Sequence, residues 1–387
     1  MFIYIFIEGE RILNQDQNNK CNKNEALNLE KTAYLWAFFT GEGDGAEQIS
    51  LAVSQGNDAL SWHTLNQGKP LFVSEKGERG LRDPFIIRSH DGNRFYLIAT
   101  DLKIAGRHGH AFHTAQMDGS RYLEIFESTD LVNWSKQRHV KVSSKLAGNT
   151  WAPKAIWHES SQQYVVFWAS NLYQTEDVRE RADITYNRMV YVTTKDFHQF
   201  SEPEIWVDVD RGIGRGTIDA VVIQEDDLFY RFMKAEENMT IRLDRSSDLF
   251  AQVKGTEYAS HTGPIDQWVT LKEQVANELP NGEGNRFTGG EGPAIFRANP
   301  KDVNGYRWYL FIDQPSYHGG PNHYIGFASN DISDGDSWVS VADKLRLQLP
   351  ENADGGKPRH GSIISITQAE YERVITAYAP HLLSNNQ

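Results

Sequence analysis

One two-part pattern recurs along the chain and constrains its fold more than any other feature. A short apolar run is followed by a polar turn and then by a second apolar run that carries aromatic residues. The first clear copy is Leu81–Arg88 followed by Arg94–Thr100. Three later copies pair the following runs: Ala152–Trp157 with Tyr164–Trp168, Asp219–Ile223 with Leu228–Phe232, and Glu291–Phe296 with Arg307–Ile312. Such a regularly repeated unit is typical of solenoids and propellers.

The two ends of the chain each hold half of one more copy. His360–Ile366 has the character of a first run without a second, and Ala33–Phe39 has that of a second run without a first. An open solenoid needs capping repeats rather than split ones. A closed ring, in contrast, is completed when its two ends pair. The sequence therefore predicts an all-β fold, a five-bladed β-propeller closed by strands from both termini.

The spacing of the copies fits four short strands in each repeat. The residues that open the first runs lie 65 to 72 positions apart, and they are Asp83, Lys154, Asp219, Glu291 and His360. Each repeat also contains a polar turn that leads to an aromatic residue: Asn57–Trp62, Ser128–Trp134, Thr194–Phe200, Ser246–Phe250 and Asn330–Trp338. Aromatic and β-branched runs between Gly, Asn and Asp turns favour antiparallel sheet. We expect one of these turns before the outer strand of each blade.

Outside the repeats the sequence predicts three kinds of segment. Residues 1–31 are polar and aperiodic, and we interpret them as a loosely ordered lead, so that residues 32–387 form one propeller domain with a short C-terminal tail. Thr367–Tyr371 is expected to cap and begin a short terminal helix. Three longer inserts are expected to form rim loops around the mouth of a central channel: residues 103–120, 171–187 and 255–290.

Composition excludes several classes of function. The net charge of −13 and the lack of a Lys/Arg-rich run argue against nucleic acid or a membrane surface as partner. The single cysteine, Cys21, excludes an internal disulfide framework and is a poor nucleophile candidate. The apolar opening Met1–Ile7 is too short to span a bilayer and lacks the features of a signal peptide. We expect a cytoplasmic protein, or a secreted one only if this N-terminus is truncated or processed.

Three of the five opening residues are carboxylates: Asp83, Asp219 and Glu291. If the repeats superpose, these side chains face one axial funnel, where like charges repel each other and lose hydration. A structural alternative is that each one caps a turn or pairs with a neighbour such as Arg82. Three carboxylates in register instead favour glycoside hydrolysis, in which one carboxylic acid protonates the departing oxygen and one carboxylate activates water.

The residues around the three carboxylates suggest a role for each. Glu291 is the expected general acid, because Gly290 and Gly292 leave room for a leaving group and its side chain is the longest. Asp83 is then the expected general base. Asp219 is expected to raise the pKa of the acid by like-charge proximity and to hold it in place.

The chain resembles family 43 of the glycoside hydrolases over roughly residues 33–367. The phrases that carry the resemblance are Arg82–Ile86, Trp151–Pro153, Ile218–Asp219, Glu291–Pro293 and Arg359–Gly361. Members of that family are five-bladed propellers that act with inversion on arabinose- and xylose-containing polysaccharides. The resemblance implies an arabinose- or xylose-containing oligosaccharide as ligand, and it places the base, modulator and acid at Asp83, Asp219 and Glu291.

The resemblance also implies roles for further residues. His360 matches a histidine that faces a calcium ion held through water, although a hydrogen-bonded core histidine is the alternative, and calcium prefers oxygen ligands. No other cofactor is expected. Trp151 is expected either to stack on a sugar ring or to lie buried between blades. Arg359 is expected to orient a sugar hydroxyl or to be solvated. Lys154 replaces the acidic residue common after Trp-Ala-Pro, and it either pairs with a carboxylate or alters a sugar contact.

The expected activity is the exo-acting, inverting removal of terminal α-L-arabinofuranosyl units from arabinan- or arabinoxylan-type oligosaccharides. β-1,4-Xylosidase and galactofuranosidase activities are the alternatives. Retaining invertase-like propellers share an Arg-Asp-Pro phrase, but their Glu-Cys acid motif is absent here. A non-catalytic sugar-binding propeller would keep Trp151 without needing three carboxylates. His108, His110 and His113 lie close together but lack the helical spacing of zinc motifs, so no zinc site is predicted there.

Overall fold

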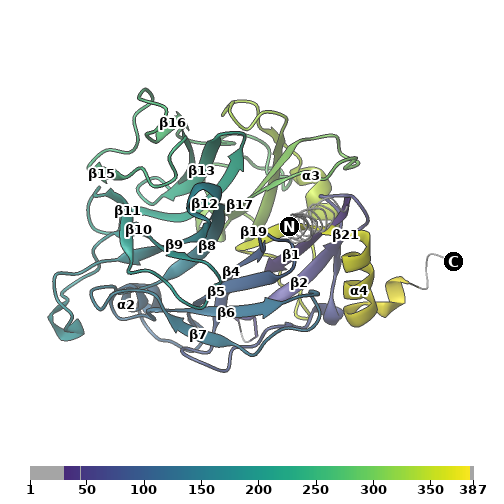
Figure 1. Cartoon of the computed structure of the whole chain (residues 1–387), viewed down its shortest axis with the longest axis horizontal. Helices are drawn as coiled ribbons and strands as arrows, with labels where there is room; N and C mark the ends of the chain where they lie inside the picture. Colours follow the sequence, from purple (N-terminus) through teal and green to yellow (C-terminus); the bar gives the residue numbers. More distant parts are fainter. Residues whose placement is uncertain (1–29, 44, 384–387) are drawn as a thin grey trace, which may run out of the picture.

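The computed structural model describes residues 30–43 and 45–383. Nearly all of the predicted lead, with Met1–Ile7 and Cys21, lies outside the described residues, and its loose order stays a prediction. The described chain folds into five sheets, each built on one copy of the repeat (Figure 1).

Each sheet is one blade. From the inner strand outward, the first blade consists of β4 (Leu81–Arg88), β5 (Phe95–Asp101), β6 (Tyr122–Ser128) and β7 (Arg138–Lys141), and the second of β8 (Trp151–His158), β9 (Gln163–Asn171), β10 (Asn187–Thr194) and β11 (Glu204–Val209), with β15 (Val253–Gly255) added. The third blade consists of β12 (Thr217–Glu225), β13 (Leu228–Ala235), β14 (Thr240–Ser246) and β16 (Val269–Lys272), and the fourth of β17 (Glu291–Arg297), β18 (Trp308–Gln314), β19 (His323–Ser329) and β20 (Val339–Ser340). The closing blade consists of β21 (Gly361–Thr367), β1 (Lys31–Phe38), β2 (Ser50–Ser54) and β3 (Trp62–Thr64).

The inner strands form a closed ring. Each inner strand contacts the next one: β4 contacts β8, β8 contacts β12, β12 contacts β17, β17 contacts β21, and β21 contacts β4. The ring closes because β21, from the C-terminal part of the chain, pairs antiparallel with β1, from Lys31 opposite Thr367 to Phe38 opposite Gly361. The predicted five-bladed propeller and its closure by strands from both ends are confirmed.

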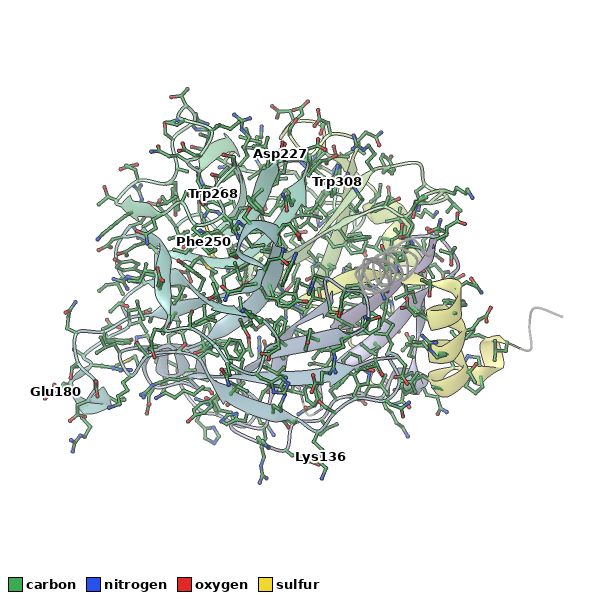
Figure 2. All side chains as sticks on the ribbon, in the orientation of Figure 1. Lys136, Glu180, Asp227, Phe250, Trp268 and Trp308 are labelled. Carbon is green, nitrogen blue, oxygen red and sulfur yellow. The ribbon has the colours of Figure 1, made fainter. Side chains whose placement is uncertain are left out.

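The core lies between the blades rather than in one central mass. Five buried apolar clusters each join two neighbouring blades. In the cluster between the last blade and the closing blade, Trp36 is fully buried, and its ring contacts Trp62, Phe311 and Tyr324 at centroid distances of 5.0 to 5.6 Å. Figure 2 likewise shows the buried Trp308 among the ribbons, whereas the exposed Lys136 lies at the edge of the molecule.

The helices are short and lie outside the ring of strands. They are α2 (Ala111–Met117), α3 (Ala342–Leu345) and α4 (Gln368–Tyr378), with 3-10 turns at Asn66–Gly68, Glu159–Ser161, Val178–Glu180, Ser316–His318, Arg346–Gln348 and Pro380–Leu382. The predicted terminal helix is confirmed as α4, which a capping box between Thr367 and Glu370 begins and which packs on the closing blade (Figure 1). Among the described residues, no helix has the length and apolar character needed to cross a membrane.

The third blade, which begins with β12, differs from the prediction in its outer part. The turn Ser246–Phe250 leads into β15, which leaves its own blade and pairs parallel with β11 of the neighbouring blade. The outer strand of the third blade is β16, at Val269–Lys272, inside the insert 255–290 that was predicted as a rim loop. The prediction that the turn Ser246–Phe250 precedes the outer strand of its own blade is wrong, as is the prediction that 255–290 is only a rim loop. Edge pairing between two blades leaves no signal in a local sequence pattern.

Replacing Trp36 by Ala should lower the free energy of unfolding by about 3–5 kcal/mol, because it empties the apolar cluster that joins the closing blade to its neighbour. Urea denaturation measures the loss. Leu347→Ala is the control, since Leu347 is 68% exposed and its loss should change the free energy by less than about 0.5 kcal/mol. Equal losses in the two variants would contradict this account of the core.

Candidate active site

Four of the five inner strands carry the same irregularity near their beginning. Pairing with the second strand of the blade skips two residues, and the first skipped residue has a left-handed backbone. The φ angle is 52° at Asp83, 53° at Ala152, 59° at Asp219 and 56° at Gly292. A bulge re-aims side chains, and it is common next to active sites. Asp and Gly accept this conformation more readily than most residues, which fits their presence at three of the four positions.

The shared bulge corrects the predicted superposition of the repeats. Asp83 and Asp219 are equivalent, as predicted, but their counterparts in β8 and β17 are Ala152 and Gly292. Glu291 lies one residue before the bulge position, and Lys154 lies two residues after it. The predicted equivalence of these two residues to the aspartates is therefore wrong, because a bulge adds a residue to one strand and the hydrophobic pattern does not show where.

Asp83 is buried and is held at both oxygens. Its Oδ1 lies 2.8 Å from Nδ1 of His360, and its Oδ2 accepts a hydrogen bond of 2.8 Å from the hydroxyl of Thr100. Burial by itself would raise the pKa of Asp83, but the hydrogen bond and charge of His360, with Arg82 and Thr100, outweigh burial and lower that pKa to about 2. Asp83 is thus a carboxylate at any pH near neutral.

Glu291 lies among cations. Nζ of Lys234 is 2.7 Å from its Oε2, the hydroxyl of Tyr317 donates to the same oxygen at 2.5 Å, and a guanidinium nitrogen of Arg359 is 3.3 Å from Oε1. Burial opposes ionisation, but Lys234 and His360 outweigh it and hold the pKa of Glu291 well below its usual range. In this structure, Glu291 is therefore ionised near neutral pH.

Asp219 occupies the corresponding place in the third blade and faces the same cluster. Its Oδ2 accepts a hydrogen bond of 2.9 Å from the backbone N–H of Gly292, next to Glu291. Burial raises the pKa of Asp219, and the negative charges of Glu291 and Asp83 add to that effect, although His360 and Lys234 oppose it. Two neighbouring carboxylates, Asp83 and Asp219, thus have pKa values shifted in opposite directions.

His360 joins the three carboxylates. Its Nε2 lies 3.4 Å from Oε1 of Glu291, on the side of the ring opposite to the nitrogen that faces Asp83. Burial would lower the pKa of His360, but Asp219, Asp83 and Glu291 together raise it to about 10. A Cβ atom at Gly292 would lie 2.4 Å from Cδ2 of this ring, so only glycine admits the imidazole here. The ring is a buried cation that separates Asp83 from Glu291.

These residues line one pocket at the mouth of the channel, with a volume of about 470 Å³. All six predicted site residues border it: Asp83, Trp151, Asp219, Glu291, Arg359 and His360. Trp151 is partly buried at the start of β8, and its ring has an edge contact with Phe112, with centroids 6.3 Å apart. Arg359 is buried and ion-paired to Asp313 at 2.6 Å rather than solvated.

One of the three predicted rim inserts borders the pocket directly. Phe112 and Gln116, in the insert 103–120, line it, whereas no lining residue among the described residues comes from within 171–187 or 255–290. The insert 171–187 contacts a pocket residue instead of lining the pocket. Its end residues Asn171 and Asn187 donate hydrogen bonds of 3.2 and 3.3 Å to Oε1 of Gln116. Figure 2 shows Glu180, in the same insert, at the edge of the molecule.

Comparison with known proteins agrees with this geometry. The profile of a family related to glycosyl hydrolase family 43, described as "Probable glycosyl hydrolase domain", matches residues 30–372, which include all five blades. The chain belongs to this family.

An α-L-arabinofuranosidase of Bifidobacterium longum subsp. longum is 31% identical over 380 residues, which include 87% of this chain and 33% of that protein. The chain therefore spans one third of the length of that relative. Among solved structures, a thermostable family-43 glycoside hydrolase has 15% identity and a TM-score of 0.45 over 76% of this chain and 91% of its own. The catalytic domain of a Coprinopsis cinerea GH62 α-L-arabinofuranosidase has 13% identity and a TM-score of 0.42 over 76% of each chain.

Three side chains of this glycosyl hydrolase domain were missed by sequence reasoning: Lys234, Asp313 and Tyr317. The alternation of residues in β13 could have pointed to Lys234, because it follows Tyr230 and Phe232 at every second position and so shares their buried face. Asp313 directly follows the apolar run that ends at Ile312. Tyr317 lies in a 3-10 turn whose approach to Glu291 depends on the tertiary structure alone.

The residues of this site do not fit the calcium ion that the sequence suggested. Asp219, Glu291 and His360 each offer a ligand atom within 4.8 Å of the other two. However, both ring nitrogens of His360 face carboxylates, and the raised pKa of the ring keeps both protonated. Glu291 already contacts Lys234 and Arg359. A hard cation needs six to eight oxygen ligands, and here cationic side chains surround the available oxygens.

The three neighbouring histidines of the insert 103–120, at which no zinc site is predicted, have other contacts. His113 contacts Asp183 at 2.7 Å, and its ring lies 6.4 Å from that of His110. Among the residues that the structure describes, these histidines join no cluster of three close ligand atoms.

The imidazole of His360 should stay protonated up to about pH 10, because the surrounding carboxylates outweigh the effect of burial on its pKa. Replacing Asp83 by Asn should lower that pKa, since it removes one of the negative charges. A ¹⁵N NMR titration of the histidine side chains measures both effects. Asp183→Asn, which changes the partner of His113 outside the pocket, is the control and should leave His360 unchanged. An imidazole of His360 that titrates near 6.5 in the unaltered protein would contradict the charged cluster.

Proposed function

We propose that this protein is a glycoside hydrolase that removes terminal α-L-arabinofuranosyl units from arabinan- or arabinoxylan-type oligosaccharides with inversion of configuration. The observation that carries the proposal is the convergence of Asp83, Asp219 and Glu291 around His360 in one pocket. Membership of the family related to glycosyl hydrolase family 43 supports the reaction class. The 31% identity to an α-L-arabinofuranosidase supports the choice of sugar.

Asp83 acts as the general base in this proposal. With a pKa of about 2 it is ionised throughout the neutral range. It takes a proton from a water molecule while the water oxygen bonds to the anomeric carbon of the terminal sugar. The contacts to His360 and Thr100 fix the orientation of the carboxylate before the substrate arrives.

Glu291 acts as the general acid and protonates the oxygen of the departing sugar as its bond to the anomeric carbon breaks. For this role the pKa of Glu291 must rise from its low value in the ligand-free protein. Tyr317 is 63% exposed and donates to Glu291, so an entering sugar can displace its hydroxyl. Removal of that hydrogen bond, together with exclusion of water, favours the protonated acid.

Asp219 supports the acid rather than reacting. It accepts the backbone N–H of Gly292 and so fixes the start of β17, from which Glu291 projects. The negative charges of Asp219 and Glu291 repel each other, and this repulsion favours protonation of one of the two carboxylates.

The place of His360 between the two carboxylates is consistent with inversion. Asp83 and Glu291 contact different nitrogens of one imidazole ring, at 2.8 and 3.4 Å, so they do not contact each other through that ring. An inverting pair lies roughly 6.5–9.5 Å apart to hold the water molecule, and a retaining pair lies about 5–5.5 Å apart.

Hydrolysis of 4-nitrophenyl α-L-arabinofuranoside should exceed that of the β-D-xylopyranoside, and arabino-oligosaccharides should release only arabinose. Asp83→Asn should lower kcat by about 10²–10⁴-fold, since general base catalysis contributes that much. Glu291→Gln should cause a similar loss on oligosaccharides and a smaller one on the nitrophenyl sugar, whose leaving group needs little protonation. Rates for each variant on both substrates measure these effects.

Asp336→Asn is the matched control, because Asp336 is an exposed carboxylate paired with Lys272 outside the pocket. It should keep full activity. A preference for the xylopyranoside would identify a β-xylosidase. An unaltered protein that binds arabino-oligosaccharides without cleaving them would instead identify a sugar-binding propeller and overturn the proposal.

Replacing Lys234 by Met should move the alkaline limb of the pH profile of kcat/KM to higher pH. Lys234 lowers the pKa of Glu291, so its removal raises that pKa. A general acid is active when protonated, and activity is lost as the pH rises through its pKa. The limb should therefore move upward by roughly one pH unit or more. Lys272→Met is the control. An unchanged limb in Lys234→Met would show that Glu291 is not the acid.

A further inference from the structure

Lys154 is a buried cation that the proposed mechanism does not use. It lies in β8, whose neighbours in the ring of inner strands are β4, which carries Asp83, and β12, which carries Asp219. The side chain is 1% exposed and does not line the catalytic pocket. It instead borders a second cavity of about 450 Å³, formed by the later residues of the five inner strands. Lys154 therefore lies along the inner strands between the catalytic pocket and that second cavity.

The ammonium group of Lys154 has no direct partner of opposite charge. No hydrogen bond to its Nζ exists among the described residues, and no carboxylate lies within 4 Å of it in this part of the chain. Its close contact is the ring of Phe85 in β4, whose centroid is 5.5 Å from Nζ. An unpaired ammonium in a protein interior is costly, and such groups are common at functional sites.

The charged groups that act on this ammonium are Asp83 from β4 and Asp219 from β12. These two carboxylates disfavour each other's ionised form. A fixed positive charge in the strand between them offsets that repulsion, since the interaction acts over several ångströms in a poorly solvated interior.

We propose that Lys154 is a positioning residue whose ammonium group supplies fixed positive charge beneath Asp83 and Asp219 and favours the ionised form of Asp219. This inference rests on the proposed function, because it assigns Lys154 a task toward the same carboxylates. In this proposal the side chain of Lys154 supplies positive charge near the channel axis, because the residues of the pocket do not fit a calcium ion that could supply it.

The acid–base behaviour of Lys154 agrees with this position. Burial lowers its pKa from 10.5 to about 8, and Asp83 and Asp219 only partly oppose the shift. A lysine whose pKa is lower in the folded chain destabilises the fold below pH 8, where it is charged in both states. That loss is recovered as the pH rises from about 8 toward 10.5. The protein thus bears a stability cost at neutral pH for a charge beneath the site.

The experiment compares the unaltered protein with Lys154→Met, which keeps the length of the side chain and removes the charge. A ¹³C NMR titration of the carboxyl groups should show the pKa of Asp219 raised by about one unit in the variant. The melting temperature at pH 7 should rise by several degrees, since the unpaired charge is gone. The value of kcat/KM at pH 7 should fall about tenfold or more, and Lys154→Arg should restore most of it.

Two of these readouts do not depend on catalysis, so they decide about Lys154 even if the unaltered protein hydrolyses no glycoside. An unchanged titration of Asp219 in Lys154→Met, or a lower melting temperature, would overturn the inference. Millimolar calcium should leave the melting temperature of the unaltered protein unchanged, and a clear increase would show that a metal ion, not Lys154, supplies that positive charge. Lys301→Met, which removes an exposed lysine, is the matched control for each measurement.

Discussion

The protonated imidazole of His360 holds carboxylates from different blades in one place. It contacts Asp83 from the first complete repeat and Glu291 from the last one. His360 itself directly precedes β21, the inner strand of the closing blade, which pairs with β1 and packs between β17 and β4. Closure of the propeller and assembly of the site are therefore one event. Gly292 completes the arrangement, because any side chain there would meet the imidazole.

A balance of charges in a buried space follows from that arrangement. Three buried carboxylates of the site each contact a cation: Asp83 contacts His360, Glu291 contacts Lys234, and Asp313 contacts Arg359. Lys154 adds a cation without a direct partner. Buried ion pairs seldom add much stability, because desolvation offsets their attraction. We infer that these pairs set protonation states, while the apolar clusters between blades supply most of the stability of the fold.

The fold was predictable because its signal is periodic. Five copies of one strand pair, with the fifth split between Ala33–Phe39 and His360–Ile366, specify both the number of blades and the way the ring closes. Local sequence patterns did not predict that β15 pairs with a neighbouring blade or that β16 is the outer strand of its own blade.

The site was predictable in its carboxylates and only partly in its cations, since Arg359 and His360 were predicted and Lys234 was missed. The positions in the repeats and the family resemblance both pointed to Asp83, Asp219 and Glu291, and the structure brings all three to one pocket. Their register was wrong by one residue at Glu291, because the bulges are invisible in the sequence. Lys234 and Tyr317 reach Glu291 from a neighbouring blade and a turn, so their roles depend on distances that only the folded chain sets.

The central claim is that Asp83 and Glu291, with the ring of His360 between them, act as base and acid of a single displacement at the anomeric carbon. The most direct measurement is ¹H NMR of the first sugar formed from an α-L-arabinofuranoside, recorded before mutarotation. The account predicts that β-L-arabinofuranose appears first and then equilibrates. Initial formation of the α anomer would show a double displacement through a covalent intermediate, which would contradict the roles assigned to both carboxylates.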